Sequence, residues 1–199
     1  LMDGHSEMVT AKSLSSSENG PMVLSAFKEH IRKYRMMPRE IVTDAGPYKS
    51  DAFRKFVKQT ELLGVHWRIA TRSTEMGMIE KFHDSFQTQV CNGELFYIGE
   101  GIKSKRDGNR PSIDVIQKWK KNIMDLPTLP ELRVKYFQLI EKFNNMKRGR
   151  GKQNETRLGR WLSSDEINAV KIDDLNFIRL FCEEAKVTIQ NGIATFKGS

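Results

Sequence analysis

In the first half of the chain, segments with apolar residues at helical spacing alternate with short segments that have the apolar pattern of strands. Ser17 is the expected N-cap of a first helix with apolar residues at helical spacing, which Pro38 is expected to end. The apolar residues 41–43 then predict a short strand that leads directly to Asp44. Residues 8–14 alternate loosely after a polar turn and predict an earlier strand.

The same alternation continues after Asp44. Ser50 is the expected N-cap of a second amphipathic helix, which ends at Gly64. Residues 65–69 alternate as a half-buried strand, and residues 71–77 form a polar loop before a further helix opens near Gly77. Strands alternating with helices in this order predict an α/β fold.

The pattern changes after Cys91. Residues 92–112 are rich in glycine and charge and show no periodicity, and residues 144–160 are expected to hold a flexible basic linker. Amphipathic spacing predicts helical stretches at residues 113–124, 132–143, 164–169 and 174–182. The last segment alternates around Asn191 and Gly192, which predicts a β-hairpin.

Composition favours a soluble chain with a polyanionic partner. The 199 residues carry a net charge of +8, and nucleic acid is the leading candidate partner for such a basic protein. No apolar run is long enough to span a membrane, so no membrane partner is expected. Cys91 and Cys182 lie far apart without metal-like spacing and are expected to be reduced thiols of a cytoplasmic protein.

Two acidic residues occupy positions typical of a functional site. Asp44 follows a strand, where ligands of α/β sheets bind, and Glu80 lies in the first turn of its helix. Taken singly, each has a simpler interpretation: Asp44 as a turn-capping residue and Glu80 as a favourable charge on the helix dipole. The pair is more informative, because the 35 residues between them contain one helix, one strand and a polar loop.

The residues around this pair resemble the DDE family of transposases and retroviral-type integrases. The resemblance is carried by Ile41 to Gly46, by Leu63 to Val65, and by the segment Gly77 to His83 with its Gly-x-x-Glu-x-x-His pattern. It covers residues 1 to about 92. The chain departs from the family in having Ala45 where an asparagine is usual, and in lacking a proline in the loop before Gly77.

The resemblance implies an RNase H-like mixed sheet with flanking helices and a site of three acids that binds two Mg²⁺ or Mn²⁺ ions. Asp44 and Glu80 would be two of these catalytic, metal-binding acids. The family's activity is DNA strand cleavage and strand transfer on double-stranded DNA, at transposon ends and target, in a homo-oligomer assembled on that DNA. Asp3 is not expected to be the first acid, because too few elements separate it from Asp44. That acid is expected before Leu1, in an N-terminally truncated sheet, so the chain alone is expected to be inactive.

Several basic residues are candidate contacts to DNA phosphates. Those beside the two acids are Arg72, Lys81 and His83, although each also fits a solvated or packing role. A flexible basic run adds Lys147, Arg148, Arg150 and Lys152. Such a run binds the phosphate backbone without sequence preference, or serves only as a solvated linker.

The C-terminal third narrows the resemblance to bacteriophage Mu-type transposases. It is carried by Arg160 to Glu166 and by the hairpin around Asn191 and Gly192. The layout expected from it is a partial catalytic domain with a helical extension over residues 1–158, followed over residues 159–199 by a connector and the start of a small β-barrel. A prokaryotic or phage-encoded cytoplasmic enzyme is expected. A retroviral-type integrase and a non-catalytic DNA-binding scaffold of the same fold remain the alternatives.

Overall fold

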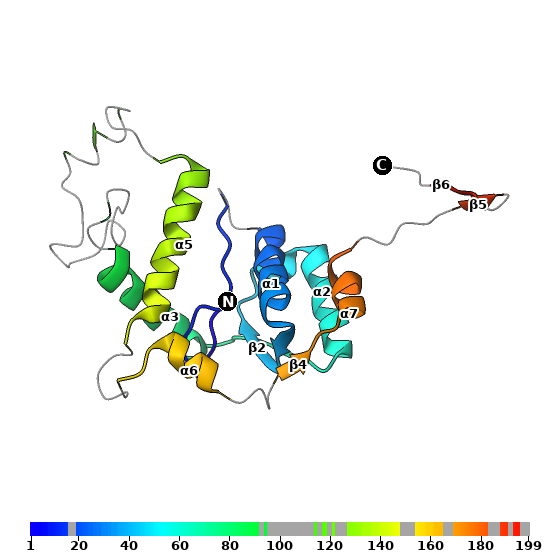
Figure 1. The fold of residues 1–199 in the computed structure, drawn as a ribbon, viewed down its shortest axis with the longest axis horizontal. Coiled ribbons are helices and arrows are strands. Elements are labelled where there is room, and N and C mark those ends of the chain that lie inside the picture. The colour runs from blue at the N-terminus through cyan, green and yellow to red at the C-terminus, as the bar shows by residue number, and fades with distance from the viewer. Residues whose placement is uncertain are drawn as a thin grey trace.

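A pair of parallel strands joined by a helix forms the centre of the fold (Figure 1). Strand β2 (Glu40–Thr43) pairs in parallel with β3 (His66–Ile69), and helix α2 (Asp51–Leu62) connects them. The chain is therefore mixed α/β, as its pattern predicts. The computed structural model describes residues 1–15, 19–91, 94, 114, 117–118, 121, 127–147, 154–164, 169–182, 188–190 and 193–195.

Helix α1 (Gly20–Tyr34) precedes this pair, and its ends differ from those expected. Asn19 caps it by accepting a 2.9 Å hydrogen bond from the N–H of Met22; Ser17 lies outside the described residues. The helix ends before Pro38, because Arg35 adopts the left-handed conformation and its N–H donates to the carbonyl of Ile31.

Pro38 instead belongs to a strand that the sequence pattern did not predict. Strand β1 (Met36–Pro38) pairs antiparallel with β4 (Ala169–Lys171), whose first residue was expected to end a helix. Helix α6 (Arg157–Ser163) ends before residue 164, so the prediction of a helix over residues 164–169 is wrong at Ala169. Only long-range pairing gives such short strands their conformation.

One other prediction is wrong, one gains detail, and several are confirmed. Residues 8–14 form no strand; only an isolated bridge joins Met2 to Val9. The expected loop over residues 71–77 contains a 3₁₀ turn, Ser73–Met76. By contrast, Ser50 caps α2 as expected, with a 3.4 Å bond from the N–H of Phe53. The following helix, α3, begins at Gly77 as expected.

The remaining elements follow in chain order. Helix α3 (Gly77–Phe86) continues into a π-helical turn, Gln87–Cys91. Helix α5 (Leu129–Asn145) matches the predicted stretch 132–143, and α7 (Asp174–Phe181) matches the predicted stretch 174–182. Strands β5 (Thr188–Gln190) and β6 (Ile193–Thr195) pair as the predicted hairpin. Most of residues 92–112, 113–124 and 148–153 lies outside the described residues.

The first hydrophobic core surrounds the parallel strands. Its centre is a group of buried aromatic rings, Phe27, Phe53, Phe56 and Trp67, with centroid separations of 5.2 to 6.4 Å. Trp67 also satisfies its indole N–H by donating to the hydroxyl of Thr60 at 2.8 Å. This group packs α1 and α2 against β3 and against β2, the strand that leads to Asp44.

Residues near the C-terminal end also contribute to this first core. Ile172 and Leu180 are buried in it, next to β4 and on α7 respectively. Contacts therefore run across the boundary expected between residues 158 and 159. No helix in the described part of the chain is long and apolar enough to cross a membrane.

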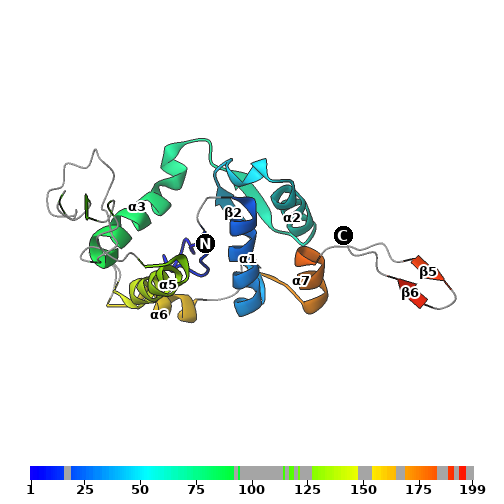
Figure 2. The same ribbon diagram turned by 90° about the horizontal axis from the view of Figure 1, so that it is seen from above.

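A second core joins α3, its π-helical continuation and α5. It contains Phe86, Val90, Leu139, Ile140 and Phe143. Figures 1 and 2 show α3, α5 and α6 grouped on one side of the N-terminal segment, with α1, α2 and α7 on the other. The helix that carries Glu80 therefore has a different packing partner from the strand that precedes Asp44.

Candidate functional site

Asp44 lies at the carboxyl end of β2, beside the end of β3. The N–H of Ala70 donates to the carbonyl of Thr43 at 2.8 Å, so the pairing of the two strands extends to the residue before Asp44. The Asp44 side chain is exposed and turns toward the following loop: a carbon added at Gly46 would lie 3.5 Å from Asp44 Oδ1. An acid at this edge of an α/β sheet is well placed to meet a ligand.

The loop after Asp44 is held by packing at the start of α1. Pro47 is buried, and Ser50 caps α2. A carbon added at Gly20 would lie only 2.3 Å from Ser50 Cβ, so only glycine allows this approach. The backbone that follows Asp44 is therefore fixed by two helix starts.

A carboxylate network holds the turn between β3 and α3. Glu75 accepts hydrogen bonds from the N–H of Thr71 at 2.8 Å and of Arg72 at 3.4 Å, and from Arg68 Nη1 at 2.6 Å. Arg68 also pairs with Glu40 on β2 at 3.3 Å. The Thr71 hydrogen bond is the main reason why the pKa of Glu75 lies below its usual range; the Arg72 N–H and Arg68 act in the same direction.

We expect Glu75→Ala to loosen the turn that leads to Glu80. The amides of Thr71 and Arg72 lose their acceptor, so their hydrogen exchange should become at least several-fold faster than in the unaltered chain. Exchange followed by NMR checks this, with Glu61→Ala on the exposed face of α2 as the matched control. Unchanged exchange at both amides would show that Glu75 does not hold the turn.

Glu80 lies in the first turn of α3, where the helix dipole favours a negative charge. Like Asp44, it is exposed, and in the described part of the chain no side chain forms a hydrogen bond or an ion pair with either carboxylate. No cluster of three potential metal ligands occurs among the described residues. The two acids thus lie at the end of β2 and the start of α3 without a third acid of the described chain grouped with them.

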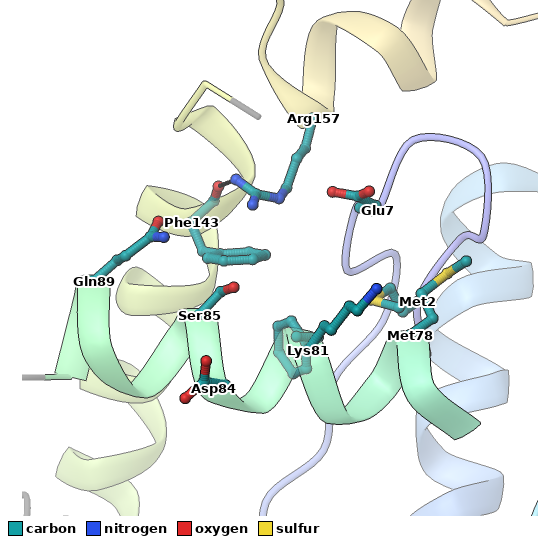
Figure 3. A pocket seen from close by; sticks show the side chains of 10 residues that line it. Met2, Glu7, Met78, Lys81, Asp84, Ser85, Gln89, Phe143 and Arg157 are labelled. Atoms are coloured by element: carbon teal, nitrogen blue, oxygen red, sulfur yellow. Dashed lines mark hydrogen bonds between the residues drawn. The ribbon is translucent and has the colours of Figure 1, made fainter. Parts of the chain in front are cut away.

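Lys81 faces a cleft on another side of α3. Figure 3 shows its side chain between the N-terminal segment and helix α3, in a cleft of about 310 Å³ that Glu7 and Arg157 also line. Arg157 is buried, with its guanidinium 3.8 Å from the centroid of the Phe143 ring. Lys81 therefore lies on the surface of the second hydrophobic core.

His83 and Arg72 occupy different surroundings. His83 is an exposed residue whose ring centroid lies 5.1 Å from that of Phe82, and desolvation by the surrounding protein lowers the pKa of the imidazole. The Arg72 side chain is exposed at the start of the 3₁₀ turn. Of the basic run, Lys147 donates to Asn154 at 3.0 Å, while Arg148, Arg150 and Lys152 lie outside the described residues.

Asp3 closes its own turn. Its Oδ2 accepts hydrogen bonds of 2.6 Å from both the N–H and the hydroxyl of Ser6. The turn rests against α3, since a carbon added at Gly4 would lie 3.8 Å from Met78 Cε. The Asp3 carboxylate thus has a structural role in this turn.

Sequence reasoning missed three residues that hold the site's surroundings. Glu75 had a detectable signal, because an acid three residues after the start of a helical turn is typical of a capping box. Arg157 and Asn144 had none, since buried polar residues are recognised only from their long-range partners. Neither protein-family models nor curated protein sequences match this chain.

Proposed function

We propose that this chain is part of a DDE-type transposase with a Mu-like layout, whose RNase H-like core performs metal-dependent DNA cleavage and strand transfer. The observation that carries the proposal is the placement of the two acids. Asp44 follows β2, which is parallel to β3 and joined to it by α2, and Glu80 lies in the first turn of the next helix. That order of elements is the one that the resemblance implies.

The donor groups fit a hard divalent cation. Asp44 and Glu80 present exposed carboxylate oxygens, which are the ligands that Mg²⁺ and Mn²⁺ prefer. When bound in a two-ion site, such ions supply Lewis-acid stabilisation of the attacking and leaving oxygens of a phosphoryl transfer. Hydrogen bonds hold the backbone next to both acids: Glu75 accepts from Thr71 in the turn before Glu80, and Ser50 accepts from Phe53 after the loop that follows Asp44.

The experiment is an electron paramagnetic resonance titration with Mn²⁺, which reports the free ion directly. Two carboxylates alone, with water in the remaining coordination positions, are expected to bind Mn²⁺ weakly. Asp44→Asn and Glu80→Gln should each weaken binding at least several-fold. Glu61→Gln, on the exposed face of α2, is the matched control and should leave it unchanged.

If both site variants bind Mn²⁺ as the unaltered chain does, the two acids are not metal ligands and the enzymatic proposal fails. A non-catalytic DNA-binding scaffold of the same fold would then be the better account, provided that the chain still binds DNA.

A further inference from the structure

A groove runs between α1 and α5, away from the two acids considered above. Its volume is about 410 Å³, and residues 12–14 form its floor. Figures 1 and 2 both show the N-terminal segment lying between these two helices. One wall of the groove is therefore formed by α1 and the other by α5, which lie on opposite sides of the N-terminal segment.

Positive side chains line this groove on both walls. Lys28 and Arg32 lie one helical turn apart on α1, Arg133 contributes from α5, and Lys12 lies on the floor. The Lys28 side chain is half-buried, and its ammonium also lies 5.8 Å from the centroid of the Phe181 ring. Glu29 is the only acid among those lining residues that belong to the described part of the chain. The groove thus carries an excess of positive charge over a short distance.

The positively charged side chains of the groove differ in how many ion pairs and hydrogen bonds they form with other residues of the protein. Lys12 pairs with Glu141 at 2.5 Å and is only 12% exposed, so its charge is largely used within the protein. Arg133 donates one hydrogen bond of 3.0 Å to the carbonyl of Leu14 and keeps its other donors exposed. Arg32 is exposed and forms no ion pair with any residue that the structure describes.

The apolar part of the groove offers no platform for bases. Phe137 is the aromatic residue of the lining, it is partly buried, and the Lys12 ammonium lies 5.0 Å from its ring centroid. Recognition of unpaired bases relies on open aromatic faces, whereas contact with a phosphate backbone needs only accessible cations. The lining therefore favours the backbone of a duplex.

We infer that the groove between α1 and α5 binds the phosphate backbone of double-stranded DNA without sequence preference, through Lys28, Arg32 and Arg133. This inference rests on the proposed function for the identity of the polyanion. It adds a DNA-contacting surface whose lining residues include neither Asp44 nor Glu80.

The test is binding of a labelled random-sequence duplex, measured by fluorescence anisotropy at several salt concentrations. EDTA is present, so that metal binding plays no part. The double variant Lys28→Gln/Arg32→Gln should reduce the salt dependence of log K by about two, and Arg133→Gln by about one, since each phosphate contact contributes about 0.9. The matched control is Lys55→Gln/Lys58→Gln, which removes the same charge from the exposed face of α2.

The outcomes separate this inference from the proposed function. Equal losses in the groove and control variants, or no loss in the groove variants, would overturn the groove as the binding surface. A selective loss in the groove variants supports it, even if the Mn²⁺ titration shows that Asp44 and Glu80 bind no ion and the enzymatic proposal fails. An unaltered chain that binds no duplex would overturn both.

Discussion

Asn144→Ala is expected to lower the free energy of unfolding by about 3 kcal/mol, because it leaves two buried backbone groups without partners. The Asn144 amide donates to the carbonyl of Val9 at 2.9 Å, and its carbonyl accepts from the N–H of Val9 at 3.0 Å. Both residues are buried. One side chain of α5 thus satisfies both backbone polar groups of Val9 in the N-terminal segment, as a neighbouring strand would.

The neighbouring position provides the control. Asn145 is exposed and makes one hydrogen bond, of 2.9 Å, to the carbonyl of Glu141 within its own helix. Asn145→Ala is therefore expected to change stability by no more than about 0.5 kcal/mol. Urea unfolding of both variants measures the difference, and similar losses at the two positions would contradict the role given to Asn144.

Stability is expected to fall by up to about 3 kcal/mol as the pH is lowered from about 6.5 to about 4, because of His30. The ring is 4% exposed, and its Nδ1 lies 3.0 Å from the hydroxyl of Thr10. Burial is the main cause that lowers the pKa of His30 to about 4. The unfolded chain binds this proton near pH 6.5, so between the two values it binds more protons than the folded chain, and acidification favours unfolding.

Denaturant unfolding at about pH 7 and about pH 4.5 checks this expectation. His30→Gln should show a smaller loss of stability between the two pH values, whatever its stability at neutral pH. Removal of the exposed His66 by His66→Gln is the control and should preserve the loss. An unchanged loss in the His30 variant would assign the pH dependence to other groups.

Local signals predicted the part of the fold that carries the two acids. The apolar run before Asp44, the cap at Ser50 and the start of α3 at Gly77 are each specified by residues within one or two turns of chain. The parallel pairing of β2 with β3 also follows from strand–helix–strand order. These elements required no information from distant residues.

Long-range contacts explain what the sequence did not reveal. The pairing of Met36 with Lys171 joins two three-residue strands from opposite ends of the chain, and neither strand has a periodicity of its own. Arg157 looked like part of a flexible basic linker, yet it lies buried against Phe143. The direction of Lys81 toward the cleft beside the N-terminal segment likewise depends on how α3 packs.

Paramagnetic line broadening by Mn²⁺ in NMR spectra tests most directly whether Asp44 and Glu80 bind the same divalent ion, as proposed. The amides of residues 44–46 and 77–81 are expected to broaden together at the same Mn²⁺ concentration, and Asp44→Asn is expected to remove the effect at both segments. Broadening at only one of the two segments, or persistence at residues 77–81 after Asp44→Asn, would contradict the proposal.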